Sequence, residues 1–503
     1  AGIPKLNLSS LGNILPILKD VKFPTQISVK GELDIAKNIS FVPDMVQKIQ
    51  FNLRSLEKGT LNLPEPLTNI YPIQNLNING VIGAGLKNIK IASSDIFLDY
   101  GTHATLEVVT TGLPEYLSSG DLSLLLTTLK STVSNVPTEK IPNVWPKGVG
   151  SSAHKWVAES LSKGMIETAD FRLDFKGDEL VDLYGDLLAK GVTVDYLSPM
   201  PKVDAVNARI YLYPDKVHIL TETGKVGDLK LLKGDILLTD VDIDPSWAKI
   251  KLNIEGPVAQ ALKLLDSPPL EFPKDFGIIS EKASGTAQIE TDLFFRLDTD
   301  IEPKDVQVSA QATLKNAGIT LATPKWTFMT LTVKDNILDL QGKANLFKLP
   351  LHLKWRENFF PTDGIRSSYD VSANLSSQKI KSVYPDIEKW MKGDISVHLT
   401  ANQTEKTNKF SGQLLVEGTE AFLHSYLLNF TKEKGLPFSL NLRFDEADSE
   451  AGKITLDVQG KADTALQQNI NVLADMSWGA EFSINLKKPF KNCLQYDIIY
   501  YII

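Results

Sequence analysis

The chain contains 503 residues, of which 43% are hydrophobic and 23% are charged, and its formal net charge is −8. This apolar fraction is too high for a disordered chain, and the length corresponds to about three to four ordinary domains or to one long repetitive assembly. The acidic balance argues against nucleic acid as a partner, because nucleic-acid-binding surfaces are basic. The single cysteine, Cys493, excludes a disulfide framework and a thiolate metal cluster.

Neither a transmembrane helix nor a signal peptide is predicted. The longest uncharged apolar runs fall short of the ~18–20 residues that cross a bilayer. The chain begins Ala1-Gly2-Ile3-Pro4-Lys5, without a methionine or a basic segment. We therefore expect a fragment of a longer protein, or a mature product that has lost its start.

The dominant pattern is an alternation of apolar and polar residues that recurs from one end of the chain to the other, and it predicts about 25 strands. Each run is bounded by Gly, Pro, Asn or Asp, which is typical of strand ends. One of the clearest runs places Val306, Val308, Ala310, Ala312 and Leu314 at every second position. In chain order, the runs are 27–35, 49–53, 76–78, 96–100, 104–108, 208–212, 287–289, 306–314, 349–355, 369–375, 395–399, 438–444, 454–458, 470–478 and 482–486.

Strict alternation favours antiparallel strands with one apolar face and one solvated face. Open twisted sheets rarely exceed about 10 strands without curling or splitting. The predicted fold is therefore mostly β, a long curled antiparallel sheet that forms an elongated groove, with a few short capping helices. Division into packed sandwiches is the alternative.

Four segments have apolar residues at helical spacing, and we expect them to cap or plug the β assembly. Residues 116–131 carry Leu122, Leu125, Leu126 and Leu129 at this spacing. Gly164 stands where a helix beginning at residue 151 would stop. The predicted helices are 116–131, 151–163, 257–266 and 383–392.

Proline-rich or turn-rich stretches suggest three segments. Residues 1–136 form an N-terminal β segment with a short helix near 116–131, and 137–360 form a central region. We expect residues 361–503 to form a C-terminal β-rich continuation of the groove, and we expect this segment to be truncated. The breaks on which this division rests are 137–146, 267–273 and 358–368.

Motifs that carry chemistry are weak throughout. Residues 148–153 (GVGSSA) match a dinucleotide-binding fingerprint, but two prolines stand where the preceding strand is required. No G-x-S-x-G sequence offers a hydrolase nucleophile. Asp240, Asp242 and Asp244 alternate with Val241 and Ile243 as on the wet face of a strand, with a Ca²⁺ site as the alternative.

The histidines are too dispersed to suggest a metal site, since none lies within five residues of another. We expect them on strand surfaces or caps, and we predict no metal, no cofactor and no enzymatic activity. They are His103, His154, His218, His352, His398 and His424.

A series of short motifs between residues 145 and 355 resembles the YhdP-type central domain of the AsmA-like family of Gram-negative envelope proteins. The resemblance covers roughly residues 70–360 and rests on the serial order of the motifs. They are Trp145-Pro146, Lys155-Trp156-Val157, Gly164-Met165-Ile166, Phe171-Arg172-Leu173, Tyr196-Leu197-Ser198-Pro199-Met200-Pro201, Ala208-Arg209-Ile210, a turn at 224–227, Gly234-Asp235-Ile236, Glu255-Gly256-Pro257, Ala261-Leu262-Lys263-Leu264-Leu265, Pro268-Pro269-Leu270 and Gly285-Thr286-Ala287.

The resemblance implies a non-enzymatic, bridge-like lipid transfer protein. It implies an inner-membrane anchor on the full-length protein, a periplasmic location and a β groove that carries phospholipids toward the outer membrane. The expected partners are phospholipids, the two membranes of the envelope and other envelope proteins. We expect the anchor helix of the family to be missing from this chain.

Apolar residues of the alternating runs are the candidates for the groove lining, although the pattern leaves open which face points inward. One rival is an envelope scaffold with a closed β core and no lipid cargo. The other is a carbohydrate-active β-solenoid enzyme, which would need clustered carboxylates on one face and a regular repeat. The candidate lining residues are Ile289, Val306, Val308, Leu351, Leu353, Val397, Leu399, Leu440, Leu442, Leu456 and Val472.

Overall fold

The fold is known from a computed structural model of the chain. None of the helices in its described residues combines the length and the hydropathy that a membrane crossing requires. The described residues are 2–7, 24–34, 45–62, 68–146, 149–268, 270, 279–297, 301–302, 305–320, 325–326, 330–334, 337–346, 349–361, 364–382, 384–389, 391–404, 409–425, 430–432, 434–435, 438–448, 453–462 and 478–485.

The chain divides into two compact units. The N-terminal unit comprises Ala1–Leu252 and Phe295–Ile301, and the C-terminal unit comprises Asn253–Phe294 and Glu302–Ile503. Antiparallel strands dominate both units, which confirms the predicted mostly-β class. The three segments proposed from the sequence stay a prediction.

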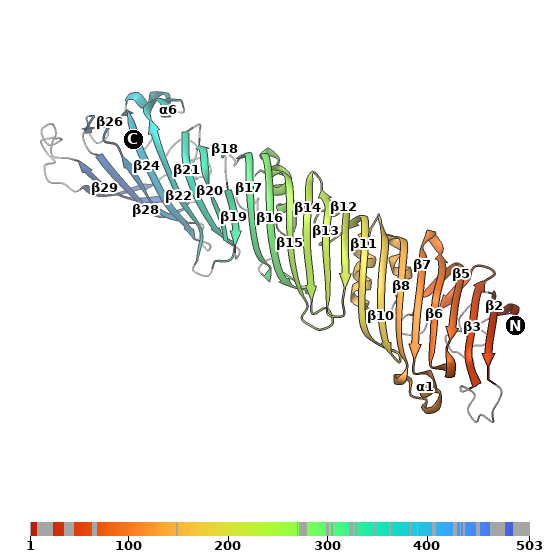
Figure 1. The fold of residues 1–503 in the computed structure, drawn as a ribbon. Helices are drawn as coiled ribbons and strands as arrows, with labels where there is room; N and C mark the ends of the chain where they lie inside the picture. Colours follow the sequence, from red (N-terminus) through yellow and green to blue (C-terminus); the bar gives the residue numbers. More distant parts are fainter. Residues whose placement is uncertain are drawn as a thin grey trace. The chain divides into compact units, whose positions relative to one another are not determined.

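In the N-terminal unit nearly every strand pairs antiparallel with its neighbour in sequence, in the order β1-β2-β3-β5-β6-β7-β8-β10-β11-β12-β13-β14 (Figure 1). Two short strands, β4 and β9, pair with the ends of β5 and β11. The strands are β1 (Gly2–Asn7), β2 (Pro24–Leu33), β3 (Val46–Ser55), β4 (Gly59–Asn62), β5 (Ile70–Ile82), β6 (Asn88–Leu98), β7 (His103–Thr111), β8 (Leu126–Pro137), β9 (Leu161–Ser162), β10 (Met165–Lys176), β11 (Glu179–Val194), β12 (Val203–Leu212), β13 (Lys216–Val226), β14 (Leu229–Thr239) and β15 (Trp247–Pro257), the last of which crosses the unit boundary.

The C-terminal unit repeats this meander, in the order β16-β17-β19-β20-β21-β22-β24-β25-β28-β29-β30. Strand β18 pairs with β17, and β23, β26 and β27 form a separate small sheet. The strands are β16 (Ser284–Arg296), β17 (Gln307–Thr320), β18 (Lys325–Trp326), β19 (Thr330–Lys334), β20 (Ile337–Leu346), β21 (Leu349–Asn358), β22 (Ile365–Ser376), β23 (Met391–Lys392), β24 (Asp394–Thr404), β25 (Lys409–Glu417), β26 (Phe422–Ser425), β27 (Phe430–Lys432), β28 (Phe438–Asp448), β29 (Lys453–Ala462) and β30 (Trp478–Asn485).

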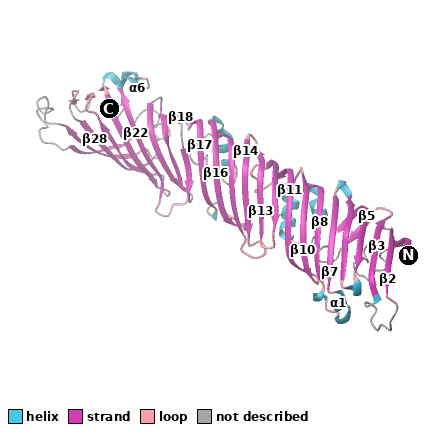
Figure 2. Ribbon diagram, viewed as in Figure 1, coloured by secondary structure: helices cyan, strands magenta, loops and turns pink. Residues whose placement is uncertain are grey.

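The helices are short and occur in the connections between successive strands of the chain (Figure 2). The described α-helices are α1 (Leu113–Ser119), α2 (Ile141–Val144), α3 (Ser151–Ser160), α4 (Val258–Leu265) and α6 (Ser377–Lys381). The described 3₁₀ turns are η4 (Ala84–Leu86), η5 (Asp99–Gly101), η6 (Leu122–Leu124), η7 (Thr138–Lys140), η8 (Ser280–Lys282) and η10 (Pro385–Lys389).

The prediction of a helix over residues 116–131 is wrong. Helix α1 ends at Ser119 because Gly120 adopts a left-handed conformation, with φ of 74°. Residues 126–137 form β8, which pairs with β7 on one side and β10 on the other. The β-branched residues of this segment, such as Thr127, Thr128 and Val133, favour a strand, and the two ladders override the leucine spacing.

The other helix predictions are closer to the structure. The predicted 257–266 corresponds to α4, and 151–163 corresponds to α3 followed by the short strand β9. The prediction over 383–392 is displaced, because α6 precedes it, η10 is a 3₁₀ turn and β23 is a strand. Val383 lies outside the described residues.

The predicted strands mostly coincide with observed ones. All alternating runs from 27–35 to 454–458 fall largely within strands, with Val306 one residue before β17 and Tyr100 in η5. Ile35 and residues 470–477 lie outside the described residues, as does Leu486. The alternation therefore identified the strands because one face of each unit's sheet is apolar.

Gly164, in the turn that leads into β10, provides a test of this local geometry. It has φ of 66°, and an added Cβ would overlap the backbone of Lys190 and Gly191. Gly101 also has a positive φ, 78°, but an added Cβ there would meet nothing within 4 Å. Gly101→Ala should therefore lose only the ~1–2 kcal/mol of a left-handed alanine.

We expect Gly164→Ala to lose at least a further ~1 kcal/mol of unfolding free energy, because overpacking adds ~1–3 kcal/mol. Urea denaturation of both variants measures this difference. Equal losses would show that the contact at Gly164 is not tight.

Candidate functional site

Strand register places the apolar residues of the C-terminal unit on one face of its sheet. Leu353 lies opposite Val371, Val371 opposite Leu399, and Leu399 opposite Leu414. Residues directly opposite each other in an antiparallel pair share a face. We call this surface, which includes these four residues, the apolar face of the C-terminal unit.

The predicted lining residues whose side chains lie in described strands all belong to this face. Ile289 pairs with Ala312 and Leu293 with Val308, so β16 and β17 contribute to the same surface. Their role in lipid binding stays a prediction. The residues on this face are Ile289, Val308, Leu351, Leu353, Val397 and Leu399.

Five candidates are placed less completely. Val306 immediately precedes β17. Leu440 and Leu442 pair with Val416 and Leu414, and Leu456 is in β29, but their side chains lie outside the described part of the chain. Val472 lies outside it altogether.

The opposite face of the C-terminal unit is polar. Lys354 Nζ lies 4.0 Å from Asp370, and His398 Nε2 lies 3.0 Å from the same carboxylate. Arg356 Nε is 3.5 Å from Asp339. These exposed pairs contribute little to stability individually, but their charged groups make this face hydrophilic.

The sheet of the N-terminal unit likewise has one apolar face and one polar face. Ala104 pairs with Val133, Val133 with Ala169, and the row continues through Leu187 to Ile210. On the opposite face Arg209 donates two hydrogen bonds to Asp186, at 2.8 and 2.6 Å, and this lowers the pKa of the Asp186 carboxyl. His218 Nε2 lies 2.8 Å from Asp235, in accord with the strand-surface position expected for a histidine.

Helical connections lie on the apolar face of each unit. In the N-terminal unit, Val144 at the end of α2, Trp145 just after it and Val157 of α3 pack against buried residues of β8, β10 and β11. In the C-terminal unit, α4 packs through Val258 and Leu262. A second cover, α6 with η10, closes one end of the strands around the fully buried Ile387.

A charged residue interrupts the apolar face of the C-terminal unit at the other end of its strands. Glu357 is fully buried and pairs across the sheet with Leu338. Its carboxylate accepts hydrogen bonds from Arg366 Nε at 2.8 Å, from Trp355 Nε1 at 3.1 Å and from Ser367 Oγ. A buried carboxylate needs such partners, so these residues form one satisfied cluster.

Next to this cluster, burial raises the pKa of the Tyr369 hydroxyl, while a hydrogen bond with Ser367 opposes the shift. Sequence reasoning missed the cluster. The available signal was that Glu357 is in phase with the apolar residues Leu351, Leu353 and Trp355 of the alternating run.

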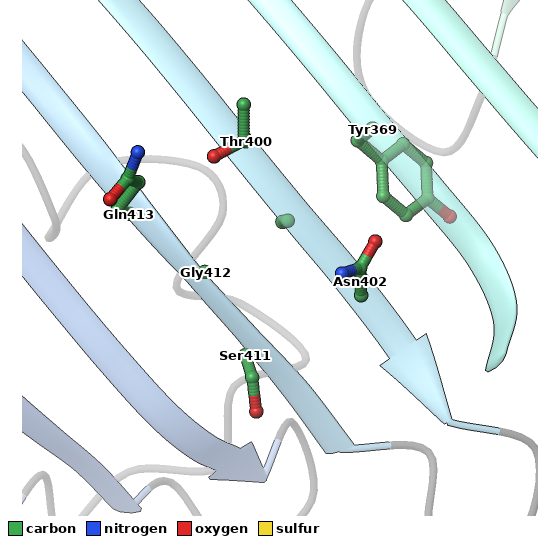
Figure 3. A pocket seen from close by; sticks show the side chains of 7 residues that line it. Tyr369, Thr400, Asn402, Ser411, Gly412 and Gln413 are labelled. Carbon is green, nitrogen blue, oxygen red and sulfur yellow. The ribbon is translucent and has the colours of Figure 1, made fainter. Parts of the chain in front are cut away.

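A shallow depression of about 400 Å³ lies between β22, β24 and β25 (Figure 3). Five of its residues contribute hydroxyl or amide groups, and none contributes a carboxylate, histidine or cysteine. This composition supplies hydrogen-bond donors and acceptors. The lining residues are Tyr369, Thr400, Ala401, Asn402, Ser411, Gly412 and Gln413.

Two sequence hypotheses about ligands are not supported by the local structure. Asp240, Asp242 and Asp244 follow β14 in a turn rather than forming a strand, because Asp240 has a φ of 57° that ends the ladder. No group of three His, Cys, Asp or Glu side chains in the described ranges could hold a metal ion. Gly150, in the dinucleotide-like motif, follows helix α2 and not the strand that a nucleotide fold requires.

The YhdP family, described as YhdP protein, matches residues 87–496, more than half of the chain. The chain belongs to the YhdP family. The match extends farther toward the C-terminus than the 70–360 recognised from motifs. No curated protein and no solved structure matches the chain. Membership of the YhdP family indicates an envelope role related to lipid transport, and this is not a known enzyme family.

The buried Glu357 cluster of this YhdP family member gives a stability prediction. Arg366→Leu leaves a buried carboxylate without its cation, which we expect to cost ~3–5 kcal/mol. Arg356→Leu, which removes the exposed pair with Asp339, should cost no more than ~1 kcal/mol. Urea denaturation monitored by tryptophan fluorescence measures both.

The double variant Glu357→Leu/Arg366→Leu supplies the control, because replacing a buried pair with apolar residues is often neutral. It should recover most of the stability lost in Arg366→Leu. A double variant as unstable as the single one would contradict the assigned pairing.

Proposed function

We propose that the chain is a non-enzymatic segment of a lipid-transfer bridge that binds phospholipid acyl chains on the apolar faces of its sheets. In this proposal, the full-length protein is anchored in the inner membrane, projects into the periplasm and carries phospholipids toward the outer membrane. Family membership supports a role in the cell envelope, and sheets with one apolar and one polar face support this mode of lipid binding.

The observation that carries the proposal is an apolar face that is only partly covered. Leu399 and Leu414 lie opposite each other, are half-buried and belong to none of the buried clusters of the described residues. A contiguous apolar surface without a partner is unusual in a soluble protein. Such a surface, backed by a charged face, offers acyl chains an environment without water.

The energetics also favour this occupant. Each methylene moved out of water gains ~0.8 kcal/mol, so two long acyl chains gain more than about 20 kcal/mol. Exposing those chains to water would be the main barrier to carrying a lipid between membranes. Aliphatic side chains along the path lower that barrier without recognising any particular atom.

The test compares two adjacent residues of β24 that point to opposite faces. Leu399→Asp places a charge on the apolar face, and Thr400→Asp places the same charge on the polar face. We expect Leu399→Asp to reduce co-purified phospholipid at least fivefold, because an unpaired charge among acyl chains is costly. Native mass spectrometry of the detergent-free chain, with lipid extraction, measures the bound phospholipid.

Thr400→Asp should retain the lipid content of the unmodified chain, and the melting temperatures of both variants show whether they fold. If Leu399→Asp unfolds, a photo-crosslinking residue at 399 or 400 replaces the charge, and only position 399 should label phospholipid. An unmodified chain without lipid, or unfolding of Leu399→Asp without labelling, would instead favour a closed scaffold.

A further inference from the structure

Helix α4 occupies part of the surface that the proposed function assigns to acyl chains. Val258 is 5% exposed and packs with Ala287 and Ala317, and Leu262 contacts this cluster as well. Leu262 also contacts the neighbouring cluster around Leu340. The helix therefore lies directly on the apolar face of the C-terminal unit, where its side chains exclude any other apolar group.

The sheet beneath α4 is shaped to receive the helix. Ala287 and Ala317 are both buried there, whereas Leu340 and Leu353 lie on the strands beyond them. Small residues let a helix approach a sheet closely. The same floor, without the helix, would be a shallow apolar recess continuous with the rest of this face.

The other two helical segments that cover an apolar face, α2 with α3 and α6 with η10, are held by hydrogen bonds as well as by packing. Asn69 donates hydrogen bonds from its side chain to the carbonyls of Pro142, Asn143 and Trp145, which fixes the connection between α2 and α3. The Ser376 side chain caps α6, and the adjoining η10 buries Ile387 completely. Each of these covers thus combines apolar packing with side-chain hydrogen bonds.

Helix α4 has a weaker attachment. It is 8 residues long, has no side-chain cap at Pro257 and contributes Val258 as its one buried residue. No hydrogen bond joins its side chains to the sheet within the described ranges. Isolated helices this short are unstable in water, so contact with the apolar face holds α4 in its helical form.

We infer that α4 is a displaceable plug, which covers the apolar face when no lipid is bound and leaves it when an acyl chain arrives. This inference rests on the proposed function. The two acyl chains of a phospholipid together carry more aliphatic carbon than the side chains of Val258 and Leu262, so exchange of one occupant for the other is favourable. The other two helical segments, α2 with α3 and α6 with η10, remain in place during the exchange.

Hydrogen exchange of the full, delipidated chain tests the inference directly. The probe is diheptanoyl phosphatidylcholine below its critical micelle concentration, which presents acyl chains without a vesicle. We expect the amides of residues 258–265 to exchange at least fivefold faster with lipid than without it. The amides of α6 should not change. Slower exchange in α4 would make the helix a roof over the lipid and would overturn the inference.

Two variants of the same helix separate plug from roof by the sign of a second measurement. Leu262→Asn weakens the contact with the sheet, and Leu265→Asn changes a residue that is 43% exposed. For a plug, Leu262→Asn lowers the lipid concentration at half-saturation severalfold and Leu265→Asn leaves it unchanged. For a roof, Leu262→Asn raises that concentration, which overturns the inference.

Val258→Ala is the second variant in case Leu262→Asn does not fold, and it should change half-saturation in the same direction. Failure of the proposed function has a different signature, namely that the unmodified chain binds no lipid at all, and the inference then falls with it. An unmodified chain that binds lipid while α4 exchanges at an unchanged rate would overturn the plug alone.

Discussion

The constraint on which both units depend is the register of their antiparallel ladders. Side chains alternate with a period of two, so a slip of one residue in any pairing would turn a strand's whole apolar set toward water. Leu353, Val371, Leu399 and Leu414 remain on one face because four successive strands keep the same phase. The same phase gathers the ion pairs of Asp370 and Asp339 on the other face.

That division of faces explains where the helices and the exceptional polar residues occur. The helical connections pack on the apolar side, since only that side offers them a hydrophobic surface. Glu357 is a charged exception within the apolar face of the C-terminal unit, and three donors compensate its burial. A carboxylate at this position is therefore compatible with folding only as part of the cluster with Arg366, Trp355 and Ser367.

Much of the fold follows from sequence patterns because one face of each strand is apolar, and α4 was recognised from its proline and its repeated Ala and Leu. Prediction from the sequence pattern failed where the same residue spacing is compatible with two kinds of secondary structure. The leucines from 122 to 129 fit a helix, although long-range ladders make that segment the strand β8. Asp240, Asp242 and Asp244 alternate like a strand, yet they form a turn.

The candidate site was predictable as a class of residues but not as a surface. Alternation identified Ile289, Leu353 and Leu399 without indicating whether they face the same way, because register between strands depends on partners that are distant in sequence. Observed pairing resolves this for the described strands. The cover formed by α4 and the buried Glu357 depend on tertiary packing, for which local periodicity holds no information.

Pairing between successive strands also determines how such a chain can assemble. In the run from β10 to β14, each new strand adds to the one just before it, so the loops that must close are short. Short loops lose little entropy on closing, and chains rich in local contacts fold quickly. The sheet of each unit can thus grow hairpin by hairpin as the polypeptide is synthesised, and its length could change in evolution by whole hairpins without disturbing the phase of the strands already in place.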